Sequence, residues 1–320
     1  MSTNPQPRRA MAAQPVRRSR GKTWLVVTMS VVILGGVGTA AYFLGWMDFT
    51  AQWSAAIPGI SSSASEEPSI QGWPLTGIEV NVSNRPALAV EMASSADLGP
   101  YDGLEFADLV FEAVGEYGNS RITAVFHSII PTRISPVLSG TNPSPWPHGF
   151  MNYLGDQDPS SFVAQAQGAG FPAPFCDFDT EYLGSTAQRQ GEMVSMLSIH
   201  LSEVSAPMWL WDFTLGQWLR WDGDDPVVSL AGSQLGVTNV LILEIDPSPQ
   251  APAGSSVATT LGWGRGAAAS GQMIVPITWQ RDSNTSMWQF FDEYGEPLVL
   301  VPGTTWVELI PTTTAYWSAV

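Results

Sequence analysis

The chain has 320 residues, of which 44% are hydrophobic and 13% are charged, and its 29 acidic and 13 basic residues give a formal net charge of −16. A surface with that charge repels phosphate polymers, which argues against nucleic acid as a partner. The single cysteine, Cys176, excludes an intramolecular disulfide, and its acidic chain context indicates a small buried side chain rather than a catalytic thiol.

Residues 1–47 contain a basic segment followed by a long uncharged one. Residues 1–22 carry six basic and no acidic residues and are rich in Pro, Ser and Gln, a composition that predicts disorder. The next 25 residues, 23–47, are uncharged. As a helix they would extend about 37 Å, enough to cross a hydrocarbon core of roughly 30 Å, with Trp24 and Trp46 near the two interfaces. We therefore expect a single transmembrane helix over residues 23–47.

The charge distribution predicts the orientation of this helix in the cell membrane. Basic residues before the span favour a cytoplasmic N-terminus, which places the bulk of the chain outside the cytoplasm. That bulk carries seven arginines and all 29 acidic residues, a formal balance of −22. A cleaved signal peptide is the alternative, with residues 38–41 as the cleavage site. However, the apolar run continues to Trp46 and exceeds the roughly 7–15 residues of a signal core, which favours an uncleaved anchor.

The remaining chain is expected to be α+β, with two domains after a linker. Residues 48–71 contain Ser clusters, two prolines and two glutamates, a composition typical of a linker. Residues 72–205 predict a mixed α+β domain, with short helices over residues 159–169, capped by Ser160 or Ser161, and over residues 187–202. Residues 206–320 alternate short apolar runs with Gly and Pro turns and predict a β-rich domain.

Residues 108–130 predict a β-hairpin around Gly118 and Asn119, a dipeptide suited to a two-residue turn. In the register set by that turn, polar side chains share one face and apolar side chains share the other. The polar face is interpreted either as a solvated surface with one weak cross-strand ion pair or as a ligand-binding cluster. The candidate ligand-binding residues on it are Glu112, Glu116, Arg121 and His127.

Several short motifs occur in a fixed order along residues 74–311. They are Asn84-Arg85-Pro86, residues 107–112, Ser135-Pro136-Val137, Ile277-Thr278-Trp279 and residues 302–306. In order and spacing they resemble the YerB-like family of bacterial extracytoplasmic lipoproteins, a domain of unknown function. The resemblance implies a two-part exported α+β protein of the Gram-positive envelope.

The chain departs from that family at three places, one of which is Ala93-Ser94, where the family commonly has an Asp-Asn pair. Leu138-Ser139-Gly140-Thr141 stands where the family usually has Arg-Ser-Ala-Arg, so a pair of arginines that could hold an anion is missing. The lipid-bearing cysteine is replaced by the predicted membrane anchor. Among the candidate site residues, the resemblance covers Glu112, Glu116 and Arg121.

Metal and cofactor motifs are absent from the sequence. His127, His148 and His200 share no spacing typical of metal ligands, and the chain has no nucleophile elbow and no phosphate-binding Gly-rich loop before a helix. The sequence therefore predicts neither a metal site nor a cofactor.

Tryptophans concentrate in the C-terminal part, where nine of the 14 follow residue 208. Exposed tryptophans in rows can stack on sugar rings, whereas tryptophans of a small β domain more often fill its interior. Both uses are compatible with the spacing.

We expect a noncatalytic envelope module that binds a ligand, a cell-wall component or an envelope protein, through the Glu112 face or the junction of the two domains. The alternative is a hydrolase of wall glycan or peptide, with Glu112 and Glu116 as its carboxylates. Residues four apart on one strand lie about 13 Å apart at their backbones, which is wide for either glycosidase arrangement.

Overall fold

The computed structural model describes residues 72–93, 100–138, 146–155, 157–166, 168, 170–181, 183–246 and 260–320. The predicted basic tail, transmembrane helix and linker lie outside these residues. Among the residues that are described, no helix is long and apolar enough to cross a membrane. The described residues belong to one compact unit, which begins at Ser69.

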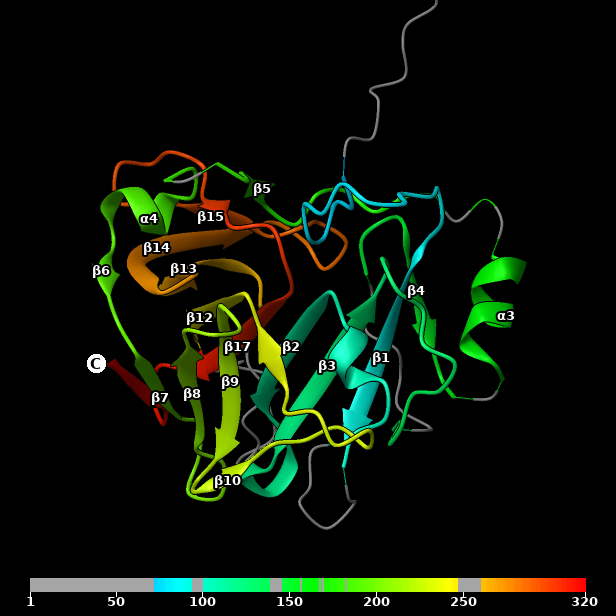
Figure 1. Cartoon of the computed structure of the whole chain (residues 1–320), viewed down its shortest axis with the longest axis horizontal. Coiled ribbons are helices and arrows are strands. Elements are labelled where there is room, and N and C mark those ends of the chain that lie inside the picture. The colour runs from blue at the N-terminus through cyan, green and yellow to red at the C-terminus, as the bar shows by residue number, and fades with distance from the viewer. Residues whose placement is uncertain are drawn as a thin grey trace, which may run out of the picture. The chain divides into compact units, whose positions relative to one another are not determined.

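A ten-stranded mixed sheet forms the centre of this unit (Figure 1). Its strand order is β15-β14-β13-β12-β17-β2-β3-β1-β4, and β6 pairs with β14. The strands are β1 (Ala87–Ala93), β2 (Leu109–Val114), β3 (Ser120–Phe126), β4 (Phe150–Tyr153), β6 (Glu192–Met193), β12 (Asn239–Ile245), β13 (Gly262–Ser270), β14 (Met273–Arg281), β15 (Gln289–Phe291) and β17 (Thr305–Pro311).

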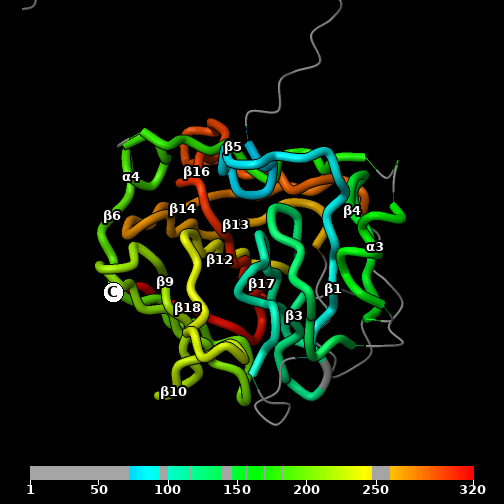
Figure 2. The backbone as a smooth tube through the Cα atoms, turned by 45° about the vertical axis from the view of Figure 1, so that its right-hand side comes forward, coloured from blue at the N-terminus to red at the C-terminus, as the bar shows by residue number. Residues whose placement is uncertain are grey.

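The strand β17 connects the N-terminal and C-terminal strands of the large sheet, because it pairs in parallel with both β12 and β2. Figure 2 shows this C-terminal strand beside β12. The large sheet therefore draws strands from both sides of residue 205, and the predicted boundary between two domains at that residue stays a prediction.

A second, antiparallel sheet of six strands has the order β10-β9-β8-β7-β18, with β11 paired to β9. Its strands are β7 (Met196–His200), β8 (Pro207–Asp212), β9 (Gln217–Asp222), β10 (Asp225–Pro226), β11 (Gly236–Val237) and β18 (Tyr316–Ala319). A parallel pair is formed by β5 (Asp177–Phe178) and β16 (Val299–Leu300).

Two short α-helices are present in the described residues. The helix α3 (Pro159–Gln165) begins after Asp158, whose side chain accepts a hydrogen bond from the Ser161 backbone N at 2.8 Å, so Asp158 is the cap rather than Ser160 or Ser161. The helix α4 (Thr186–Gln190) is much shorter than the predicted helix over residues 187–202, which is wrong. The residues of β7 instead alternate between buried positions and partly or fully exposed ones, and they complete the six-stranded sheet.

The large sheet is buried on both faces, which explains the continuous apolar runs of its central strands. On one face, side chains such as Val110, Ile122 and Ile242 pack against Leu197 and Trp209 of the small sheet. On the other face, a second core contains side chains such as Leu109, Phe111, Val125 and Trp288. This unit is therefore mostly β, with few helices.

Most tryptophans of the C-terminal part fill these two cores. Trp209, Trp218 and Trp306 are at most 2% exposed, whereas Trp263 on β13 is 77% exposed. The interpretation of the tryptophans as interior residues is confirmed for the first three and fails for Trp263.

Candidate functional site

The hairpin of β2 and β3 has a different register from the predicted one. Glu112 pairs with Ile122 rather than with Val125, a shift of three residues. The connection spans residues 115–119, with Tyr117 at φ 57° and Gly118 at φ 82°, so the predicted two-residue turn is wrong. Because side chains alternate along a strand, an odd shift moves Glu112 onto the face that carries Ile122.

The predicted polar face therefore does not exist as one cluster. Glu112 is completely buried on the face that packs against the small sheet. Arg121 is partly exposed, and its Nη2 lies 2.6 Å from Oε2 of Glu91 on the neighbouring β1. His127 follows the end of β3 and contacts Arg85, whereas Glu116 contributes its backbone to the turn.

His127 belongs to a buried junction that connects the start of β1 and the end of β3 to the start of β2. Oδ2 of Asp108 accepts hydrogen bonds from the backbone N of His127 at 2.5 Å and of Ser128 at 2.8 Å. Arg85 donates from Nε and Nη2 to the His127 carbonyl O at 2.9 and 2.7 Å. Nε2 of His127 lies 2.9 Å from the Arg85 carbonyl O, to which it donates as a neutral imidazole.

Burial determines the protonation of this junction. It raises the pKa of Asp108 to about 6, although hydrogen bonds from Ser128 and His127 and the charge of Arg85 act in the opposite direction. It also lowers the pKa of His127 to about 4. His127 is therefore uncharged at neutral pH, and these side chains serve to hold strand ends together.

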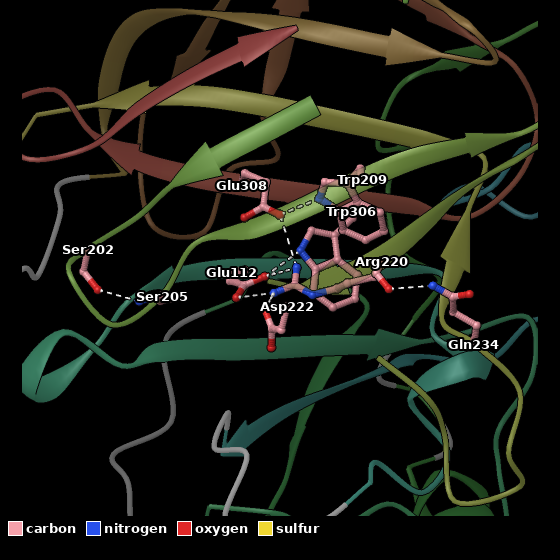
Figure 3. Close-up of polar contacts among 9 residues, drawn as sticks. All are labelled: Glu112, Ser202, Ser205, Trp209, Arg220, Asp222, Gln234, Trp306 and Glu308. Carbon is pink, nitrogen blue, oxygen red and sulfur yellow. Dashed lines mark hydrogen bonds and ion pairs between the residues drawn. The ribbon is translucent and has the colours of Figure 1, made fainter. Parts of the chain in front are cut away.

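Glu112 belongs instead to a buried charge cluster between the two sheets, made of Glu112, Arg220, Glu308, Trp209 and Trp306 (Figure 3). Arg220 Nη1 and Nη2 lie 2.5 and 2.9 Å from the two carboxylate oxygens of Glu112. Nη1 also lies 3.3 Å from Glu308 Oε1, which accepts from Trp209 Nε1 at 2.9 Å. Trp306 Nε1 donates to Glu112 Oε2 at 3.0 Å. The guanidinium carbon is 4.7 Å from the centre of the Trp306 ring.

The cluster has more acid than base, and protonation of Glu308 balances it. Burial, together with the charge of Glu112, raises the pKa of Glu308 to about 8 in spite of Arg220. Glu308 Oε2 has no hydrogen-bond partner in the described structure. Burial by itself would lower the pKa of the Arg220 guanidinium. The neighbouring carboxylates of Glu112, Glu308 and Asp222 outweigh burial, so this pKa is raised above its ordinary value. At neutral pH Glu308 is therefore mostly protonated and adds no second negative charge beside the Arg220 guanidinium.

This buried charge cluster cannot bind a ligand as it stands, because its side chains are at most 4% exposed. Sequence reasoning missed Arg220 and Glu308. The available signal was a single charged residue inside an apolar strand run, in QWLRW and in TTWVELI.

An open pocket of about 320 Å³ lies on the other face of the large sheet. We call it the Arg281 pocket. Its apolar lining includes Phe111 of β2, Trp146 and Trp288. Its polar lining consists of Thr123, Thr260, Asn284 and Arg281.

Arg281 is 9% exposed and donates three hydrogen bonds, all to uncharged oxygens. Its partners are the carbonyl O of Ser286 at 3.0 Å, Oγ1 of Thr260 at 3.1 Å and the carbonyl O of Asn284 at 2.8 Å. The guanidinium carbon also lies 5.1 Å from the centre of the Trp288 ring. Burial lowers the pKa of Arg281 from its ordinary value, but arginine stays charged in proteins.

Cys176 has a packing role. Its Sγ lies 2.8 Å from the carbonyl O of Leu298, to which it donates, and burial raises the pKa of the thiol far above its ordinary value. Such a thiol is a poor nucleophile. Across the described ranges, no group of three or more His, Cys, Asp or Glu side chains is arranged to hold a metal ion.

Comparison with known proteins gives matches over most of this unit. Residues 75–144 match the N-terminal domain, and residues 197–307 the C-terminal domain, of a family described as protein of unknown function (DUF3048). The crystal structure of the YerB protein from Bacillus subtilis is similar, with a TM-score of 0.60 and 18% identity over 77% of this chain and 98% of that chain. At this identity the likeness shows a common fold. No curated protein matches the chain.

Proposed function

This chain belongs to the DUF3048 family, and on that premise we propose that it is a noncatalytic binding module, anchored in the cell membrane, with its bulk outside the cytoplasm. The anchor and the orientation rest on the uncharged residues 23–47 and on the six basic residues before them. A cell-wall component or an envelope protein is then the partner within reach.

The binding role rests on one observation, the Arg281 pocket. Small-ligand sites are typically concave and mostly apolar, with a few polar groups that fix the orientation of the ligand. The Arg281 pocket has this character, because aromatic rings and a buried cation line the same space of about 320 Å³.

The burial of Glu112 argues against ligand binding on its face of the hairpin. It argues equally against Glu112 as a working carboxylate of a hydrolase. Glu112 is fully buried and holds Arg220 through two hydrogen bonds of 2.5 and 2.9 Å. A general acid or a nucleophile has to reach its substrate, and this carboxylate lies between two packed sheets.

The proposal is tested with the full-length chain in detergent, incubated with purified cell-wall material and sedimented. We expect the wild-type chain to cosediment and Trp146→Ala to weaken binding about tenfold, since an aromatic contact contributes roughly 1 kcal/mol or more. Trp263→Ala is the matched control, because Trp263 is 77% exposed on β13 and lies outside the pocket lining.

Equal binding by the wild type and Trp146→Ala would contradict the assignment of the pocket. Release of soluble sugars or peptides from the wall by the wild type would instead favour a hydrolase. The topology is tested with proteinase on cells stripped of their wall, where protection of residues 72–320 would contradict the proposed orientation.

A further inference from the structure

We propose that the Arg281 pocket binds an acidic sugar, that is, a sugar ring bearing a carboxylate or a phosphate. It is lined by three aromatic rings and by a buried arginine that has no carboxylate partner among the described residues. This inference rests on the proposed binding function and specifies its ligand.

The charge of Arg281 is the first support. Buried charges in proteins are normally paired, since removal of a lone charge from water is costly. Arg220 is similarly buried and holds Glu112 and Glu308. In the part of the chain that the structure describes, ion pairs are formed by Arg121, Arg133 and Arg220, and Arg281 is not among them.

The hydrogen bonds of Arg281 also favour an anionic ligand. A guanidinium has five N–H groups, and three of those of Arg281 donate to the oxygens of Ser286, Asn284 and Thr260. These bonds fix the side chain against Thr260 and the loop that follows β14, and no carboxylate among the described residues compensates its positive charge. The fixed planar group matches a carboxylate or a phosphate, which accept two parallel N–H donors.

The aromatic lining is the second support. The rings of Phe111 and Trp288 lie 6.4 Å apart between centres and within 20° of parallel, and Trp146 lies 5.8 Å from Phe111. Flat apolar walls of this kind suit the C–H face of a sugar ring. The hydroxyl groups of Thr123 and Thr260 and the Asn284 amide supply neutral partners for ring hydroxyls.

The volume limits the size of the ligand. About 320 Å³ is at the lower end of the range of small-ligand sites, roughly 300–1,000 Å³, and suits one or two rings rather than a long glycan. A longer polymer would have to present a single acidic residue or an end to this pocket.

The experiment compares sugars that differ in one charged group, titrated into the full-length chain in detergent and followed by calorimetry. The pairs are glucuronic acid with glucose, N-acetylmuramic acid with N-acetylglucosamine, and glucose 6-phosphate with glucose. We expect the acidic member of at least one pair to bind at least tenfold more tightly than its neutral partner. The first two pairs and the third distinguish a carboxylate ligand from a phosphate ligand.

Variants then assign the preference to Arg281. Arg281→Gln should abolish the preference for the acidic sugar and leave weak binding of the neutral one. Arg265→Gln is the control, because it removes the same charge from an exposed position on the adjacent β13 and should leave the preference unchanged. If Arg281→Gln does not fold, Thr123→Val, which removes a pocket hydroxyl without touching the guanidinium, should weaken binding of both members of a pair.

The failures of the two proposals differ. Equal affinity for the acidic and neutral members of every pair would overturn the inference, and so would wall binding that depends on Trp146 without binding of any acidic sugar. In both cases the proposed function stands. Absence of binding to the sugars and to wall material alike would overturn both.

Discussion

Arg220 and its two carboxylates illustrate how a single residue links the two sheets. Glu112 comes from β2, Glu308 from β17 and Arg220 from β9, and the three side chains are almost fully buried. A buried ion pair gives little net stability relative to apolar residues of the same shape, but loss of one partner leaves an uncompensated charge. The charges of this cluster are therefore paired only when both sheets are folded and packed against each other.

Replacement of the cation tests this view. Arg220→Met should lower the free energy of unfolding by about 3–5 kcal/mol, because Glu112 then stays buried without its cation. The double variant Arg220→Met with Glu112→Gln should recover at least half of that loss, since glutamine keeps an oxygen for Trp306 and carries no charge.

Denaturant unfolding measures both variants, with Arg133→Met as the control. Arg133 is 72% exposed, and loss of its ion pair with Asp102 should cost less than about 1 kcal/mol. A double variant no more stable than Arg220→Met would contradict the charge argument and indicate that lost packing dominates.

The protonation of Glu308 predicts a pH dependence of stability. Its pKa is about 8 in the folded protein, against an ordinary value of 4.5, because of burial and of the charge of Glu112, with Asp222 adding to the effect. The folded state thus binds a proton that the unfolded state releases, so stability is fully present below about pH 4.5 and falls as the pH rises through 8. The total loss is on the order of a few kcal/mol.

The informative window is pH 6.5–8.5. Asp108, with a pKa of about 6, acts in the same direction at lower pH, and His127, with a pKa of about 4, acts in the opposite direction there. Unfolding free energies measured across this window should decline in the wild type and stay nearly flat in Glu308→Gln. An equal decline in both proteins would show that another group titrates.

At the scale of elements, the β2–β3 hairpin shows how the length of one loop determines which side chains share a face of the sheet. Gly118-Asn119 predicts a two-residue turn, but the chain uses five residues and places Tyr117 in the left-handed region. In the observed register Arg121 pairs with Ala113, and its guanidinium lies next to Glu91 of β1. The strands themselves were predicted correctly, and the error lies in their register.

The observed partner of Arg121 can be tested by a double-mutant cycle. Arg121→Ala with Glu91→Ala should show a coupling of a few tenths of a kcal/mol, less than about 1, because the Arg121 side chain is 43% exposed. Arg121→Ala with Glu116→Ala should show no coupling. Coupling to Glu116 rather than to Glu91 in the unfolding free energies would restore the predicted register.

At the scale of the whole molecule, β17 determines how the parts depend on each other. It lies between β12 and β2, and Trp306 and Glu308 on it complete the buried charge cluster. Without the C-terminal part, the edge of β2 and the Glu112 carboxylate would both be exposed or unpaired. The two parts should therefore fold and unfold together.

A protease site introduced between Glu203 and Val204 of the full chain tests this dependence, because both residues are exposed in the turn between β7 and β8. After cleavage the two pieces should stay together on native gel filtration and unfold in one transition. Cleavage in the predicted linker, residues 48–71, is the control and should release the bulk from the membrane. Separation of the pieces after cleavage at residue 203 would support two independent domains at the predicted boundary.

The sequence by itself determined the features that depend on neighbouring residues. Apolar and β-branched runs identified β2, β3 and most strands after residue 208, the lone cysteine identified a packing residue, and ordered short motifs identified the family. Only the tertiary structure decided the site. Glu112 and Arg220 are 108 positions apart, Glu112 and Trp306 are 194 apart, and the Arg281 pocket combines β2, β3 and the end of β14. Such contacts depend on sheet packing and on the conformation of one loop, which local patterns leave open.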